Sequence, residues 1–191
     1  MSSKGQQTQE KILSATLDLI EQQGFHNTGL QQIIKASGAP KGSLYFHFPD
    51  GKDQIIALAL GQGTELIRSM IEHAFTMADS VQQGVGWLFD GLSARLQGSE
   101  YTKGCPVTTV ALEVGEEHPS VQSACKAAFD QWQATIGRGL QTKGMPPELA
   151  DSEAALILSQ LEGALMLARV RRCRIPMDQA RDAVLSRLAK G

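Results

Sequence analysis

Apolar side chains recur every three or four residues along almost the whole chain, and this spacing constrains the fold more than any other feature of the sequence. No stretch shows strict apolar–polar alternation followed by a two-residue turn, which would indicate a β-hairpin. A chain of 191 residues, of which 42% are hydrophobic, is long enough to bury a sizeable core. We therefore expect an all-α fold.

The first part of the chain divides into short predicted helices. A first helix is expected from about Thr8 to just before Gly24, because glycine can take the left-handed conformation that ends helices. Thr28 and Gln31 have the spacing of a capping box. We therefore expect Thr28 to cap a second helix, which runs to about Ala36.

A third, short helix follows a tight turn that contains serine and glycine. Pro40 suits the first turn of this helix, which we expect to end near Phe48. Asp50 is the expected cap of a long fourth helix. Gly61 and Gly63 lie inside that helix, where glycine is unfavourable. Their presence predicts either a bend in the helix or close packing against a neighbouring helix.

Five more helices are predicted: Val81–Leu96, Val107–Glu113 with Pro106 in its first turn, a helix that starts at Pro119 and runs to about Leu140, Ala154–Val170 and Met177–Leu188. Apolar residues occupy nearly every side of the fourth of these, so it needs two buried faces. One interpretation is a second subunit packed about a two-fold axis, and the other is a central core helix in a monomer. The candidate dimer-interface residues are Leu156, Leu158, Leu161 and Leu165.

The second and third predicted helices form the pattern of a helix-turn-helix, whose second helix enters the major groove of DNA. No acidic residue occurs from Gln22 to Pro49, where Lys35 and Lys41 lie, so a phosphate backbone would meet no carboxylate there. Short helix pairs and acid-free polar surfaces also occur in proteins that bind no DNA. The pattern alone leaves a DNA-reading element and a structural helix pair both open.

The residues of this region carry a resemblance to a known family. GAPKGSLYFHF, residues 38–48, closely resembles the recognition region of TetR-family regulators, and the likeness extends over about residues 8–60. GCPVTTVALE, residues 104–113, resembles the LmrA/YxaF branch. The resemblance implies a three-helix helix-turn-helix domain, residues 1–55, and a helical ligand-binding and dimerisation domain, residues 56–191. It also implies a repressor that binds a palindromic double-stranded DNA operator as a homodimer and is released by an inducer.

The candidate DNA contacts are polar or small residues of the helix-turn-helix, namely Thr28, Lys41, Gly42, Ser43, Tyr45, His47 and Lys52. Thr28 and the free amides of the second helix suit a phosphate oxygen. Lys41 suits a phosphate or a guanine edge, Ser43 suits a base or a phosphate, and Gly42 lets the backbone approach the groove. Lys52 follows a loop that is one residue longer than the commonest family form.

Aromatic rings in this region have two possible roles. Tyr45 and His47 present polar tips to the DNA backbone, although ordinary packing of a partly buried ring is the alternative. Leu44, Phe46 and Phe48 are assigned to the core.

A ligand cavity would need apolar walls with a few polar anchors. The candidate lining residues are Met70, Trp87, Phe89, Thr109, Glu113, Phe129, Trp132, Gln133 and Met166. Their aromatic walls favour a small, planar, apolar or aromatic inducer, and the LmrA/YxaF resemblance points to flavonoid-like or drug-like molecules. The alternative is that each of these side chains is simply part of the core.

Three cysteines without a C-x-x-C pair indicate reduced thiols and no zinc site. Cys105 precedes a predicted helix start, where the helix dipole favours a thiolate, so a thiol sensor of electrophiles or oxidants is an alternative to ligand release. Cys125 lies on a core-facing stripe and is expected to be inert.

Other classes of protein are less well supported by the sequence. It contains no nucleophile elbow, no HExxH and no glycine-rich phosphate loop, so we expect no enzyme, no cofactor and no metal. No run approaches the roughly 18 apolar residues of a membrane span, and we expect a cytoplasmic protein. A helical protein-interaction module that docks through Ala154–Val170 and binds no DNA remains an alternative.

Overall fold

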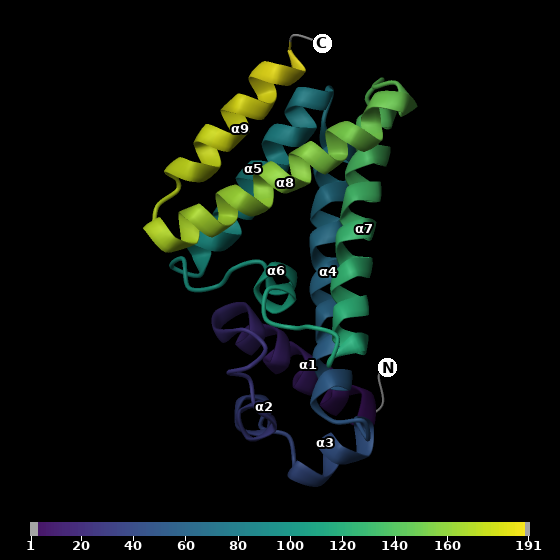
Figure 1. Cartoon of the computed structure of the whole chain (residues 1–191), viewed down its shortest axis with the longest axis vertical. Helices are drawn as coiled ribbons and strands as arrows, with labels where there is room; N and C mark the ends of the chain where they lie inside the picture. The colour runs from purple at the N-terminus through teal and green to yellow at the C-terminus, as the bar shows by residue number, and fades with distance from the viewer. Residues whose placement is uncertain (1–3, 190–191) are drawn as a thin grey trace. The chain divides into compact units, whose positions relative to one another are not determined.

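The computed structural model describes residues 4–189, and within that range every regular element is a helix (Figure 1). The helices in chain order are α1 (Lys4–Gln23), α2 (Leu30–Ser37), α3 (Lys41–His47), α4 (Lys52–Met77), α5 (Val81–Gly98), α6 (Pro106–Ala111), α7 (Pro119–Thr142), α8 (Pro147–Arg171) and α9 (Ile175–Leu188). The all-α prediction is confirmed. Pro106 and Pro119 each occupy the first position of a helix, where a missing N–H costs no helical hydrogen bond.

The chain forms two compact units. Unit 1 takes the chain up to Thr64 together with Pro106–Ala128, and unit 2 takes Glu65–Cys105 together with the chain from Phe129 onward. The division falls inside α4 and α7, so each of these helices contributes to both units. The predicted functional domains, residues 1–55 and 56–191, stay a prediction.

The core of unit 1 is built from the apolar faces of α1 to α4. Its buried members are Ile12, Leu13, Ile33, Ala39, Leu44, Phe48, Ile55 and Ala59. Each large aliphatic side chain that is fully buried contributes about 1.5–3 kcal/mol relative to exposure. Gly24 at φ +78° and Gly38 at φ +63° end α1 and α2 in the left-handed conformation, so the turns that separate these helices are encoded locally.

Two helix starts in unit 1 differ from the prediction. Gly29 caps α2, and its N–H donates to Gln32 Oε1 at 2.9 Å. Thr28 is not the cap, because its hydroxyl instead donates to the Gly24 carbonyl at 2.7 Å. Similarly α4 begins at Lys52, later than a cap at Asp50 would place it. In both places a hydrogen bond or a left-handed glycine in the preceding turn shifts the helix start by one residue.

The two glycines of α4 do not break the helix. A Cβ at Gly63 would lie 2.9 Å from Leu17 Cδ1 and 3.3 Å from Pro106 Cγ, so close packing explains this glycine as predicted. A Cβ at Gly61 would meet no atom within 4 Å.

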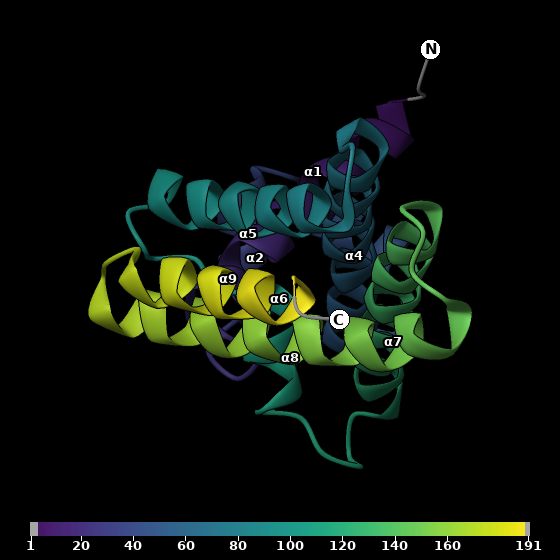
Figure 2. The ribbon, with the colours of Figure 1, turned by 90° about the horizontal axis from the view of Figure 1, so that it is seen from above.

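Unit 2 holds α5, α8 and α9 side by side, with α9 against both of the others (Figures 1 and 2). Phe75 of α4 lies close to the backbones of α5 and α7. A Cβ at Gly84 would lie 2.6 Å from Phe75 Cδ1, and one at Gly139 would lie 2.4 Å from Phe75 Cγ. Glycine at these two positions is what makes room for the Phe75 ring.

Helix α8 has a buried face and an exposed apolar face. Ala154, Ile157, Leu161, Leu165 and Ala168 are buried in the chain's own core. Leu161 and Leu165 are therefore wrong as dimer-interface residues, because packing within the single chain already covers them. Leu158 is half-buried. The exposed apolar face consists of Leu149, Leu156, Met166, Leu167 and Val170.

Two arginines at the C-terminal end of α8 are engaged in structural contacts. Arg169 Nη2 donates to the Thr102 carbonyl at 3.1 Å, and Arg172 Nη2 donates to the Glu100 carbonyl at 3.2 Å. These bonds hold the loop that follows α5 against the end of α8.

Candidate functional site

Helix α3 presents a small polar face to solvent. Leu44 and the adjoining Phe48 are completely buried, as predicted, which turns the opposite side of the helix outward. Lys41 and Gly42 are exposed, and Tyr45 has 46% of its surface exposed. Ser43 and His47 are half-buried at the edges of this face.

The assignment of Phe46 to the core is wrong, because 81% of this side chain is exposed. The physical reason is helical geometry. Residues two apart on an α-helix point about 200° away from one another, so Leu44 and Phe46 cannot share a face. Leu44 turns inward and anchors the helix, and Phe46 therefore points outward beside Tyr45.

Thr28 is fully buried, and its hydroxyl donates to the Gly24 carbonyl. Its side chain is therefore not available to a phosphate, and the prediction of a direct Thr28 contact is wrong. The first helical hydrogen bond of α2 runs from Ile33 N to Gly29 O at 3.1 Å. The backbone N–H groups of the first turn of α2 therefore remain as the groups of this helix that can bind an anion.

Lys52 is held within unit 1. Its Nζ lies 4.1 Å from the centroid of the Phe25 ring, a cation–π distance. Partial burial lowers the pKa of the ammonium, against the opposing effect of the Asp53 and Glu113 carboxylates. The side chain thus supports the turn after α1, and its predicted contact with DNA stays a prediction.

The segment between α6 and α7 is tied to the turn after α1 and to α4. Glu113 Oε2 accepts a hydrogen bond from His26 N at 2.8 Å, and His26 Nε2 donates to the Glu113 carbonyl at 3.0 Å. His118 Nδ1 lies 2.8 Å from Asp53 Oδ2, and the His118 ring lies 4.4 Å from the Phe25 ring. We call Phe25, His26, Asp53, Glu113 and His118 the unit 1 clasp.

Sequence reasoning missed this clasp. Glu113 was expected to anchor a ligand, but it binds His26, a residue 87 positions earlier in the chain. No local pattern pairs residues at such a separation, because the pairing depends on how the helices pack.

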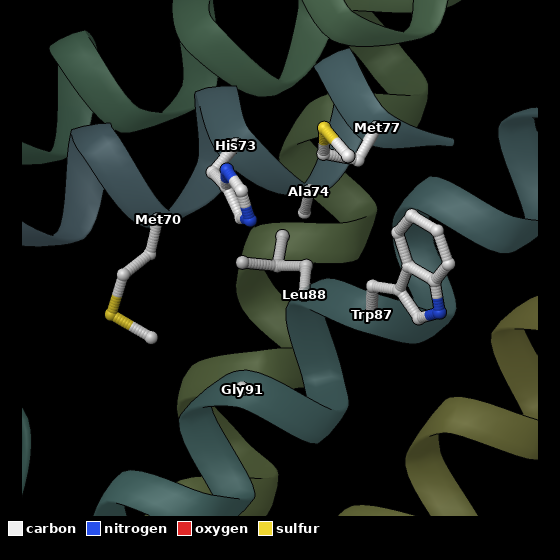
Figure 3. A pocket seen from close by; sticks show the side chains of 7 residues that line it. All are labelled: Met70, His73, Ala74, Met77, Trp87, Leu88 and Gly91. Carbon is white, nitrogen blue, oxygen red and sulfur yellow. The ribbon is translucent and has the colours of Figure 1, made fainter.

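A pocket of about 400 Å³ lies between α4 and α5 in unit 2 (Figure 3). Its lining residues are Met70, His73, Ala74 and Met77 of α4, and Trp87, Leu88 and Gly91 of α5. Trp87 and Met77 lie at one end and Met70 at the other, with the His73 ring and Leu88 between them (Figure 3). The walls are mostly apolar, and the His73 ring supplies hydrogen-bonding atoms.

Of the predicted ligand residues, this pocket brings together Met70 and Trp87. Phe89 and Trp132 are only 1% exposed and belong to the core. The half-buried Phe129 packs edge-to-face on Trp132, with ring centroids 5.7 Å apart. Phe89 and Trp132 are therefore core side chains, and none of these three aromatic side chains lines the pocket between α4 and α5.

The remaining predicted ligand residues lie elsewhere. Gln133 Nε2 donates to Asp151 Oδ1 at 3.0 Å, and Met166 is exposed on α8. Thr109 is half-buried on α6 in unit 1. His73 and Met77 were missed, although their spacing of three and seven residues after Met70 marks one face of a helix.

The three cysteines are free thiols in different surroundings. Cys105 is half-buried immediately before α6, and Cys173 is half-buried after α8. Cys125 is buried, with Sγ 3.9 Å from the Val107 carbonyl, and burial raises the pKa of this thiol to about 11.

No group of three or more His, Cys, Asp or Glu side chains within residues 4–189 is arranged to hold a metal ion. No helix in the same range combines the length and the apolar character needed to cross a membrane.

Comparison with known proteins identifies both parts of the chain. Residues 12–59 match the family model for bacterial regulatory proteins of the tetR family, and residues 81–183 match the model for the C-terminal domain of LmrA/YxaF-like transcriptional regulators. The HTH-type transcriptional regulator LmrA of Bacillus subtilis is 33% identical over 89% of this chain and 90% of its own length. YxaF of the same organism, also an HTH-type transcriptional regulator, is 32% identical over 93% of this chain and 92% of its own length.

A solved structure shows the same fold. The TetR-family regulator CifR, in a cysteine variant complexed with 26-bp operator DNA, superposes with a TM-score of 0.80 at 20% identity, over 93% of this chain and 95% of CifR. The matched families and relatives are transcriptional regulators and not enzymes. The chain therefore belongs to the TetR family of bacterial transcriptional regulators, with a C-terminal domain of the LmrA/YxaF-like type.

Proposed function

We propose that this regulator is a dimeric repressor that binds a palindromic operator through α2 and α3 and leaves it when a small aromatic inducer binds in unit 2. One observation carries the DNA-binding part: α3 exposes Lys41, Gly42 and Tyr45 on one face, within a stretch that has no acidic residue from Gln22 to Pro49. A phosphate backbone that approaches this face meets positive and neutral groups only.

Each exposed residue of α3 has a distinct role in this proposal. Lys41 pairs with a phosphate or a guanine edge, and the Tyr45 hydroxyl and the His47 ring bind backbone phosphates. Ser43 is small enough to reach a base or a phosphate from the edge of the face. A Cβ at Gly42 would meet no atom within 4 Å, so the space beside this backbone is open to DNA.

The exposed apolar face of α8 is the proposed dimer interface. Leu156 lies near its middle, and Leu149 and Val170 lie near its two ends. Five large apolar side chains on one helix face are an unusual surface for a monomer. A single recognition helix reads few base pairs, so two copies related by a two-fold axis would read the two halves of a palindrome.

The pocket between α4 and α5 is the proposed inducer site. Trp87 offers a flat face for stacking, and Met70 and Met77 can adapt their shape to a planar ring system. His73 is the polar group that would bind a hydroxyl or carbonyl of the ligand. Because the same helix α4 continues into unit 1, a ligand that prefers one position of α4 would shift the population of DNA-competent dimers.

Fluorescence anisotropy of the purified protein on its own upstream DNA tests the DNA-binding part. We expect tight binding by at least two protomers per site that weakens steeply as salt rises. Lys41→Ala and Tyr45→Ala should both lose this binding, whereas the control Lys143→Ala, in the turn after α7, should keep it. Equal and weak binding by all four proteins would contradict the proposal and favour a protein-interaction module.

The two tryptophans of the chain allow a test of the pocket. Trp87 lines the pocket and is 42% exposed, whereas Trp132 is buried in the core. A panel of flavonoid-like and other planar compounds should contain a ligand that quenches tryptophan emission and releases the DNA. Trp87→Phe should abolish the quenching, and His73→Ala should weaken binding. Quenching that persists unchanged in Trp87→Phe would place the ligand elsewhere.

A further inference from the structure

The most exposed aromatic side chain on α3 has no role in the contacts described so far. Phe46 shares the outward face of the helix with Lys41, Gly42 and Tyr45, because residues at i, i+1, i+4 and i+5 lie on one side of an α-helix. Its ring meets the His47 ring edge-on, with centroids 5.2 Å apart, and 81% of the side chain remains exposed. The ring thus stands out from the same face that the proposed function places against DNA.

We propose that Phe46 reads the operator by packing against the 5-methyl group of thymine in the major groove, an inference that rests on the proposed function. A phenyl ring has no hydrogen-bonding atom, so it cannot pair with a phosphate or with the polar edges of the bases. In the major groove only thymine presents an apolar group, and phenylalanine is among the side chains that contact it. The ring therefore selects thymine over cytosine, adenine and guanine.

The surroundings of Phe46 support a close approach to the base edges. Gly42 lies one helical turn earlier on the same face, and no atom lies within 4 Å of the position that a Cβ would take there. The backbone beside the ring is thus uncovered. Lys41 at the start of the face can fix the helix on a phosphate, which sets how far the ring enters the groove.

Replacing thymine with deoxyuridine isolates the methyl group, because the two bases pair identically and differ only in that group. A binding site is first selected from a random duplex library with the wild-type protein. Each thymine of the site is then replaced singly by deoxyuridine, and Kd is measured by anisotropy for wild type, Phe46→Ala and Leu112→Ala. Leu112 is a matched control, since it is an apolar side chain of unit 1 that is 79% exposed and lies outside α3.

We expect one or two thymine positions in each half-site at which deoxyuridine weakens wild-type binding about fourfold, the factor that burial of one methyl group is worth. Phe46→Ala should bind the thymine site more weakly and should no longer distinguish thymine from deoxyuridine at those positions. Leu112→Ala should behave like wild type.

Two outcomes would overturn the inference while the proposed function stands. In one, wild type binds every deoxyuridine site as tightly as the thymine site. In the other, Phe46→Ala binds more weakly but keeps the full preference for the methyl group, which would mean that the ring packs on the sugar–phosphate backbone. If the wild-type protein selects no DNA at all, the proposed function itself fails, and the inference fails with it.

Discussion

His118 Nδ1 lies 2.8 Å from Asp53 Oδ2, so the residue that precedes α7 is hydrogen-bonded to the first turn of α4. The His118 ring also packs on Phe25, whose ring further contacts the His26 ring and the Lys52 ammonium. Both side chains of the hydrogen-bonded pair are partly exposed. The contact joins two segments of unit 1 that are 65 residues apart in the chain.

A double-mutant cycle measures the strength of this contact. Asp53→Asn, His118→Ala and the double variant should give a coupling free energy of about 0.5–1 kcal/mol, because the pair is only partly shielded from water. His118→Ala alone should cost more than Asp53→Asn, because it also removes the packing on Phe25. Urea denaturation at neutral pH gives the four values. A coupling energy near zero would show that the two side chains do not stabilise one another.

The glycines that face Phe75 should not tolerate a side chain. Gly139→Ala and Gly84→Ala should each lower the free energy of unfolding by about 1–3 kcal/mol, because the new methyl group overlaps the Phe75 ring. Gly61→Ala is the matched control in α4, since no neighbour lies within 4 Å of its Cβ position. That variant should be more stable than wild type by about 0.5–1 kcal/mol, because alanine favours the helix. Equal stability of all three variants would contradict the observed packing.

Alkylation should distinguish the three thiols. With the pKa of Cys125 raised to about 11, this thiol is protonated at pH 8, and thiolate is the reactive form. Iodoacetamide should therefore modify the half-buried Cys105 and Cys173 well before Cys125 in the native protein, and all three in urea. Mass spectrometry of peptides gives the rates. Early modification of Cys125 in the native protein would show that its environment opens readily.

The same reagent tests the thiol-sensor alternative. If Cys105 senses electrophiles, alkylation should release DNA from wild type but not from Cys105→Ser. If the pocket between α4 and α5 is the sensor, Cys105→Ser should still respond to the planar ligand that quenches Trp87. The anisotropy assay on operator DNA separates these results.

The exposed face of α8 should control the oligomeric state. Leu156→Glu places a charge on the proposed interface and should convert the dimer to a folded monomer, because Leu156 contributes little to the core of its own chain. Leu161→Ala is the contrasting variant, since Leu161 is buried, and it should cost about 2–5 kcal/mol of stability. Light scattering after size exclusion gives the mass, and circular dichroism confirms folding. A Leu156→Glu protein that remains dimeric would contradict the assignment.

Local signals in the sequence predicted most of the helices and several of their ends. Gly24 and Gly38 stop helices through their own backbone conformation, and Pro106 and Pro119 begin them. The start of α2 was predicted one residue too early. The Thr28 hydroxyl was expected to cap the first turn of α2, but in the structure it donates a hydrogen bond to the Gly24 carbonyl. The conformation of the turn after α1 determines which of these hydrogen bonds Thr28 makes.

The candidate site was predictable only in part. Lys41, Gly42 and Tyr45 could be identified from the residues of α3, and the structure exposes all three. The residues of the candidate ligand pocket were not predictable as a set, because aromatic and methionine side chains at helical spacing fit a core as well as a cavity. Only the packing of the helices distinguishes Trp87 of α5, which lines a pocket, from Trp132 of α7, which is buried in the core.

The sequence by itself determined the all-α fold and the location of the helix that is proposed to read DNA, because hydrophobic periodicity, helix caps and the residues of α3 are local properties. The tertiary structure alone decided which apolar side chains turn outward. Leu156 and Phe46 are exposed while Leu161 and Leu44 are buried, although all four are apolar. The tertiary structure also brought together the residues of the unit 1 clasp. Asp53 and His118 are separated by 65 positions in the chain, and His26 and Glu113 by 87, so these pairs meet only once the helices have packed.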